Sequence, residues 1–258
     1  MEPILTWTSI GGQPFNARLY ADGDRYSLWI DPMGWFHIDG GVPSITVPPG
    51  SEARLREQRL WGIPAALCFI HRGDIPLHAS AVDVEGSALL FAAPGRFGKT
   101  TLAAAFLQAG HRVLSEDISC CRTDGTPSVL PGPSVLRVRR DTYERLEFPG
   151  TYLVAEEPHR VHLAIEEGLR GDGLPVPLRG IVFLREGDLD MQRVPTQASL
   201  RDLWTLSFKL PTDPARARCF QGIAALASGV PVWNLHRPLT FTSLGSVIER
   251  IVSTCLNP

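Results

Sequence analysis

Lysine is nearly absent from this chain of 258 residues: Lys99 and Lys209 are the two lysines among its 25 basic side chains. An excess of either charge is absent too, because 27 acidic residues bring the net charge to −2. Proteins that bind nucleic acid gather positive charge on one face in order to displace counterions from phosphates. We therefore expect no nucleic-acid partner.

Long apolar runs are also lacking. The longest stretches of low polarity, Gly62–Ile70 and Gly222–Trp233, are well below the roughly 20 residues that a membrane span needs. The first residues, Met1-Glu2-Pro3, do not read as a signal peptide. Cysteine is sparse, odd in number and without paired spacing, which favours reduced, buried thiols in a cytoplasmic protein without a membrane partner. The cysteines are Cys68, Cys120, Cys121, Cys219 and Cys255.

The composition, with 44% hydrophobic and 20% charged residues, is that of a globular protein. Its length suggests one main domain with a small additional module. Residues 1–50 contain two strand patterns, Tyr26–Ile30 and Trp35–Ile38, around the turn sequence Asp31–Gly34. The sequence therefore predicts a β-rich N-terminal module over 1–50 and a larger domain over 51–258.

Strand and helix patterns alternate along the larger domain. Strands are predicted at 77–82, 87–92, 113–114, 118–121, 179–185 and 230–235. Helices are predicted from Ser51 onward and at 100–109, 141–146, 198–210, 214–228 and 244–256. Apart from the short helix at 141–146, residues 122–180 are expected to be rich in turns. Alternation of this kind is typical of an α/β fold.

One segment carries a recognisable chemical pattern. Ala93-Pro-Gly-Arg-Phe-Gly-Lys99-Thr100 matches the phosphate-binding loop G-x-x-x-x-G-K-[ST] at every fixed position except the first, where alanine replaces glycine. A predicted strand precedes it and a predicted helix follows, as the loop requires. An ordinary turn between strand and helix would account for Gly95 and Gly98, but not for one of two lysines followed by a hydroxyl. The segment therefore predicts nucleotide phosphate binding.

The flanks extend this pattern. His78 lies upstream in Leu77–Val82, and Glu116 and Asp117 follow the predicted helix. With the loop, they resemble the HPr kinase/phosphorylase family and its shorter relatives, among them lasso-peptide precursor kinases. The resemblance is best over residues 60–121. It implies a P-loop core like that of HPr kinase and phosphoenolpyruvate carboxykinase, with a mixed β-sheet and flanking helices.

The resemblance also implies roles for single residues. ATP and Mg²⁺ would be the cofactors, with Thr100 and Asp117 toward the metal, Glu116 as the candidate base and His78 orienting the phosphate or the carboxylates. The family usually has two aspartates here, and the longer Glu116 leaves open that Asp117 takes the role of base. Catalysis would thus use His78, Lys99, Glu116 and Asp117. The nucleotide would be held by Pro94, Gly95, Arg96, Phe97, Gly98, Lys99, Thr100 and Thr101.

The expected function is ATP-dependent transfer of a phosphoryl group to a hydroxyl, of the serine type on family grounds, in a peptide or protein. The precursor of a ribosomally made peptide product, such as a lasso peptide, is one acceptor of this kind. The resemblance leaves a homo-oligomer open. A second hypothesis is a regulatory or scaffold protein that binds a nucleotide without transfer. Ala93, Arg96, Phe97 and Glu116, which depart from the usual pattern, favour that alternative.

Overall fold

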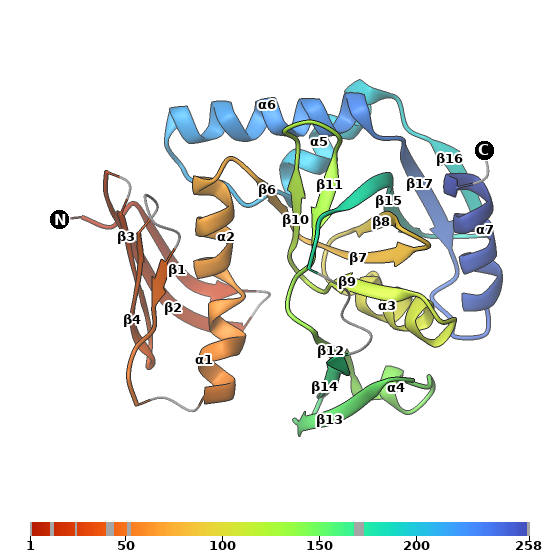
Figure 1. Cartoon of the computed structure of the whole chain (residues 1–258), viewed down its shortest axis with the longest axis horizontal. Coiled ribbons are helices and arrows are strands. Elements are labelled where there is room, and N and C mark those ends of the chain that lie inside the picture. Colours follow the sequence, from red (N-terminus) through yellow and green to blue (C-terminus); the bar gives the residue numbers. More distant parts are fainter. Residues whose placement is uncertain are drawn as a thin grey trace. The chain divides into compact units, whose positions relative to one another are not determined.

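The computed structural model describes residues 2–10, 13–23, 25–39, 44–50, 53–167 and 173–256. These residues form a mixed α/β structure (Figure 1), so the predicted α/β class is confirmed. The chain divides into two compact units. Unit 1 comprises Met1–Asp74 and Phe208–Cys219, and unit 2 comprises Ile75–Ser207 and Phe220–Pro258.

Unit 1 contains an antiparallel sheet in which each strand pairs with the next along the chain. Its side chains alternate between core and surface, as Tyr26, Leu28 and Ile30 show by lying buried along one strand. The predicted hairpin around Asp31–Gly34 is confirmed. The strands are β1 Leu5–Ile10, β2 Gln13–Asp22, β3 Arg25–Ile30, β4 Gly34–Asp39 and β5 Ser44–Thr46.

Two helices, α1 Ala53–Leu60 and α2 Ile63–His71, complete the N-terminal part of unit 1. Leu67 of α2 belongs to the same buried cluster as the sheet residues Leu28 and Phe36. The helix predicted from Ser51 is present from Ala53, whereas Ser51 and Glu52 lie outside the described residues.

Unit 2 is built on a mixed sheet. Its centre consists of three parallel strands in the order β8-β15-β17, so their carboxyl ends lie at the same edge. β7 runs antiparallel to β8 and pairs with β9 on its other side. The strands are β6 Ile75–Leu77, β7 Ala79–Val84, β8 Ser87–Ala92, β9 Arg112–Ser115, β10 Ser119–Arg122, β11 Ser128–Leu130, β15 Val176–Glu186, β16 Asp190–Arg193 and β17 Val232–Arg237.

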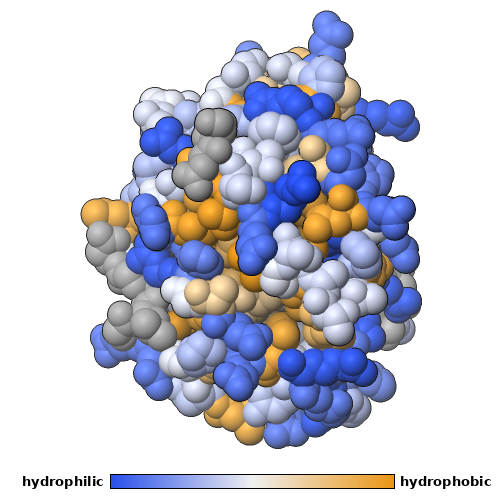
Figure 2. All heavy atoms as spheres, turned by 90° about the vertical axis from the view of Figure 1, so that its right-hand side faces the viewer, coloured by the Kyte–Doolittle hydropathy of each residue, from blue (hydrophilic) through white to orange (hydrophobic). Residues whose placement is uncertain are grey.

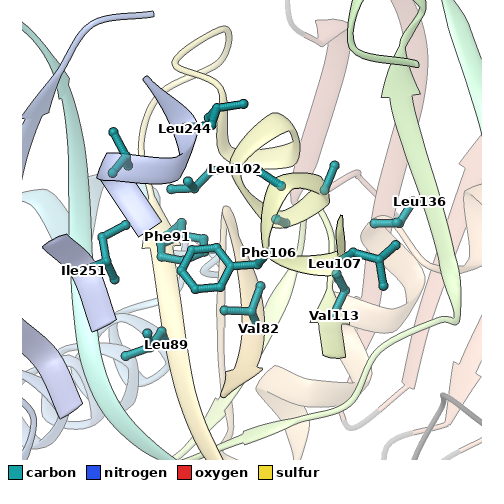
Figure 3. Close-up of a cluster of buried hydrophobic side chains, with 14 of the residues drawn as sticks. Val82, Leu89, Phe91, Leu102, Phe106, Leu107, Val113, Leu136, Leu244 and Ile251 are labelled. Atoms are coloured by element: carbon teal, nitrogen blue, oxygen red, sulfur yellow. The ribbon is translucent and has the colours of Figure 1, made fainter. Parts of the chain in front are cut away.

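Helices α3 Lys99–Gln108 and α7 Leu244–Leu256 pack on this sheet. Figure 3 shows Phe91 of β8 facing Phe106 of α3, with ring centroids 5.2 Å apart, and Ile251 of α7 beside them. This core fixes α3 against β8, and it thereby fixes the loop that joins them. On the face drawn in Figure 2, hydrophobic side chains are interspersed with hydrophilic ones.

Residues 122–180 differ most from expectation. In place of a turn-rich segment with one helix, a second small sheet runs in the order β12-β14-β13, from Val135–Arg139, Arg160–Ile165 and Thr151–Glu156. The short helix α4 spans Arg140–Tyr143. In β12, the buried Leu136 and Val138 alternate with arginines, a strand pattern that the surrounding prolines and glycines obscure.

Two element boundaries also differ. The strand predicted over 77–82 is divided at His78 into β6 and β7. Helix α5 spans Thr196–Leu206 and ends before the predicted 210, because Ser207 is extended and bridges to Leu77. Helix α6 spans Asp213–Gly229.

All five cysteines lie in the described residues, and none forms a disulfide; Cys120, Cys121 and Cys219 are buried, and Cys68 and Cys255 are partly buried. Among the described residues, no helix combines the length and apolarity of a membrane span.

Candidate functional site

The loop between β8 and α3 lies in the strand–loop–helix context that the sequence predicted. β8 ends at Ala92, and α3 begins at Lys99. Arg96 and Gly98 both have left-handed backbones, with φ of 70° and 75°, which turn the loop twice before the helix starts. The first N–H groups of a helix have no partner within it and carry the positive end of its dipole. The loop can therefore receive an anion at the start of α3.

Lys99 lies across this loop. Its Nζ donates hydrogen bonds to the carbonyl oxygens of Ala93 at 2.8 Å and Pro94 at 3.1 Å. The side chain is buried, and burial lowers the lysine pKa, while Asp117 and Glu116 act in the opposite direction. The ammonium group is thus held in the loop by neutral acceptors and stays within the field of two carboxylates.

The acidic pair follows β9 directly. Glu116 is buried and accepts a hydrogen bond of 2.9 Å from the Thr100 hydroxyl, which links the pair to the loop. Asp117 has a left-handed backbone, with φ of 71°, and its side chain is about half exposed. The two neighbouring carboxylates thus differ in exposure although they follow the same strand.

His78 lies at the break between β6 and β7. Its backbone N–H donates to Leu206 O at 2.8 Å, and its Nε2 lies 3.3 Å from Asp117 Oδ1. Of the two surroundings that the resemblance suggested for His78, the structure thus shows contact with a carboxylate. The histidine is positioned to orient Asp117.

Sequence reasoning missed Arg137. From β12, its Nη2 donates to Asp117 Oδ2 at 2.9 Å and its Nε to Glu116 Oε2 at 3.3 Å. Arg160, one of the 23 arginines of the sequence, donates to Arg137 O at 3.2 Å. Because β12 was not predicted, no sequence signal placed Arg137 near the acidic pair.

The pKa values of the two carboxyl groups are shifted in opposite directions. Burial raises the pKa of Glu116, although Arg137 and the bond from Thr100 oppose the shift. Burial also acts to raise the pKa of Asp117, but the hydrogen bond from His78 and the charges of Arg137, His78 and Lys99 outweigh it, and that pKa is well below its ordinary value. Asp117 is therefore the more readily ionised of the pair.

The remaining predicted residues lie in the loop or just after it. Pro94, Gly95 and Phe97 belong to the turn before α3. Thr101, however, points its hydroxyl to a different partner, because its Oγ1 lies 3.0 Å from Thr142 Oγ1 of α4. Thr100 and Thr101 thus have different surroundings, and only the first contacts the acidic pair.

A metal ion has two oxygen ligands available here. The described residues contain no group of three histidine, cysteine or acidic side chains that could hold a metal. Thr100 Oγ1 and Glu116 Oε1 lie 2.9 Å apart, however, and Mg²⁺ is commonly held by one or two protein oxygens together with substrate phosphates. The donors present therefore fit a magnesium ion that arrives with a nucleotide.

Comparison of the sequence with models of known families and with curated proteins finds no match. Among solved structures, the chain is similar to the Hpr(Ser) kinase/phosphatase from Coxiella burnetii, with a TM-score of 0.40 and 12% sequence identity. The match covers 69% of this chain and 88% of that chain, and the likeness is a distant one.

Proposed function

We propose that this protein is an ATP-dependent, Mg²⁺-requiring kinase that transfers the γ-phosphoryl group to a hydroxyl of a peptide or protein. The observation that carries the proposal is the hydrogen bond from Thr100 to Glu116. This bond connects the loop that contains Lys99, the residue before Thr100, to the acidic pair Glu116 and Asp117. Phosphoryl transfer needs three things: a cation that offsets the phosphate charge, oxygen atoms that hold the metal ion, and a carboxylate near the nucleophile.

Lys99 would exchange neutral partners for charged ones. In the structure its ammonium bonds to the carbonyls of Ala93 and Pro94. A triphosphate in the loop offers it anionic oxygens, and charge-assisted hydrogen bonds are stronger than those to carbonyls. A lysine suits this task because its compact ammonium sits on a flexible stem, whereas arginine is a rigid planar fork.

Thr100 and Glu116 would hold the metal. Bound Mg²⁺ supplies positive charge that offsets the charge on the transferring phosphate. Glu116 accepts the Thr100 bond directly, while Asp117 faces His78. We therefore propose that Glu116 contacts the metal ion. The resemblance gave that role to Asp117.

Asp117 would then accept the proton of the acceptor hydroxyl. As that oxygen forms its bond to the γ-phosphorus, the bond from phosphorus to the β,γ-bridging oxygen breaks, and ADP leaves. Asp117 is half exposed and has a low pKa, so it is an ionised hydrogen-bond acceptor at neutral pH. A loose transition state asks mainly for orientation of the hydroxyl, for which a weak base suffices.

The acceptor class follows from the resemblance of the loop and acidic pair. It points to a serine-type hydroxyl, with the precursor of a ribosomally made peptide, such as a lasso peptide, as the first substrate to test. Such precursors are separate chains, so transfer would be detected as a phosphate added to the mass of the peptide.

A regulatory or scaffold protein that binds a nucleotide without transfer is the second candidate. The observation in its favour is Arg137, which pairs with both Glu116 and Asp117. An arginine in that place offsets part of the charge of the two carboxylates, as it would in a purely structural ion-pair network.

The test combines nucleotide binding with turnover. Purified protein with Mg²⁺, ATP or GTP, and candidate peptides should give a phosphopeptide, and Lys99→Met should lower the rate by about 10²-fold or more. Lys209→Met, at the other lysine, serves as the matched control and should leave the rate unchanged. Nucleotide binding without transfer to any acceptor would favour the regulatory alternative, and absence of binding would reject both.

A further inference from the structure

A buried arginine behind the loop has no place in the chemistry described so far. Arg237 ends β17 and is 2% exposed. Its Nη2 donates to the carbonyl oxygens of Phe97 at 3.1 Å and Gly98 at 3.4 Å, and its Nη1 to Pro238 O at 3.3 Å. Its Nε is buried and makes no hydrogen bond within the described residues.

Among the residues that the structure describes, no anionic partner faces the charge of Arg237. Its hydrogen-bond acceptors are neutral carbonyls, and it forms no ion pair with a described carboxylate. Arg185, near the end of the parallel neighbour β15, is by contrast paired with Asp202. A buried ion without a counter-charge is costly, and burial alone lowers the pKa of Arg237. An anion bound on the other side of the loop would supply the missing charge.

The contacts of Arg237 determine the direction in which two peptide groups of the loop point. In a trans peptide the C=O and the following N–H point in opposite directions. The guanidinium holds the carbonyls of Phe97 and Gly98, so the N–H groups of Gly98 and Lys99 are directed away from it. These two amides lie at the start of α3, where the helix dipole also favours an anion.

Gly98 provides the space for this contact. A Cβ added at Gly98 would lie 2.5 Å from Arg237 Nη2, closer than Cβ atoms lie to other heavy atoms in proteins. The glycine is therefore needed for the approach of the guanidinium as well as for its positive φ.

We propose that Arg237 is a positioning residue for phosphate binding: it orients the Gly98 and Lys99 amides and places an uncompensated positive charge behind the loop. The inference rests on the nucleotide site proposed above. Arg237 acts through the loop, since its burial keeps it from direct contact with the ligand.

The experiment measures binding and needs no acceptor substrate. Calorimetric titrations with Mg·ATP, inorganic tripolyphosphate and adenosine would be run on the wild type, Arg237→Met, Arg237→Lys and Arg185→Met. Arg237→Met should weaken binding of ATP and tripolyphosphate by about tenfold or more, and leave binding of adenosine unchanged. Arg237→Lys, which keeps the charge, should recover most of the loss, and Arg185→Met should match the wild type.

The outcomes separate the two proposals. Wild-type protein that binds neither ATP nor tripolyphosphate rejects the nucleotide site and this inference together. A wild type that binds both, with Arg237→Met binding equally well or losing adenosine to the same degree, rejects the role of Arg237 alone. If circular dichroism shows that Arg237→Met is unfolded, Arg237→Lys decides: tripolyphosphate affinity within about threefold of wild type supports the role of charge, and a loss of about tenfold overturns it.

Discussion

The Thr100 hydroxyl donates a hydrogen bond of 2.9 Å to the Glu116 carboxylate, across 16 positions of sequence. Thr100 lies in the first turn of α3, and Glu116 directly follows β9, so the bond joins two different parts of unit 2. This bond converts two separate sequence patterns into one site, and it determines which carboxylate faces the loop hydroxyl.

Thr100→Val should weaken the binding of Mg²⁺ at the site. The substitution keeps the shape of the side chain and removes the hydroxyl, so the Mg²⁺ concentration for half-maximal activity should rise by about tenfold. Thr100→Ser restores a hydroxyl and should return most of the activity. Thr205→Val, at a surface position on α5, is the control. An unchanged Mg²⁺ requirement in Thr100→Val would exclude this hydroxyl as a ligand.

Glu116→Gln and Asp117→Asn should have different effects. Loss of the base lowers turnover by about 10²- to 10⁴-fold, which we expect for Asp117→Asn with nucleotide affinity retained. Glu116→Gln should mainly raise the Mg²⁺ requirement. Both replacements are nearly isosteric, and asparagine tolerates the left-handed backbone of Asp117. The reverse pattern in steady-state kinetics would return the role of base to Glu116.

His78→Gln should move the acid limb of the pH–rate profile. His78 lowers the pKa of Asp117, so its removal raises that pKa, and Asp117 becomes protonated at higher pH than in the wild type. The acid limb of kcat/KM should therefore shift to higher pH. His159→Gln, at an exposed position just before β14, is the control. An unshifted limb with a uniformly lower rate would mean that His78 does not act through Asp117.

Arg137→Met should destabilise the fold in a pH-dependent way. At neutral pH it leaves Glu116 buried without its counter-charge, at a cost of about 3 kcal/mol. Burial raises the pKa of Glu116, so this group takes up a proton as the pH falls, and the difference from wild type should then shrink. Urea unfolding at pH 7 and pH 4 measures both values.

The neighbouring Arg139→Met is the matched control for that experiment. Arg139 lies on the same strand, is largely exposed and pairs with Asp141 on the surface. Its loss should change the free energy of unfolding by less than about 0.5 kcal/mol. A pH-independent loss of stability in Arg137→Met would point to lost packing instead of charge.

Much of the fold was predictable where periodicity and turn chemistry agree. The hairpin of β3 and β4 and the succession of β8, loop and α3 follow from local patterns alone. The sheet containing β12 did not, because its partner strand β14 lies more than twenty residues away, with α4 and β13 between them. Pairing over such distances leaves little local trace.

The residues of the candidate site also fall into those that local sequence indicates and those that it does not. Lys99 and Thr100 fall in one continuous motif and were named from it, whereas Glu116 and Asp117 were named from the resemblance to a known family. Arg137 and Arg237 lie on strands whose neighbours are set by tertiary pairing. One arginine among 23 cannot be singled out without knowing which strands meet.

Unit 1 is not continuous in sequence, and this has a consequence for synthesis. Leu210 and Ala215 are part of the core that contains Leu28 and Phe36. The ribosome makes 1–74 first, but that core stays incomplete until 208–219 have emerged, roughly 7 to 30 s later at about 5–20 residues per second. Residues 1–74 therefore complete their core only after residues 75–207 of unit 2 have been synthesised.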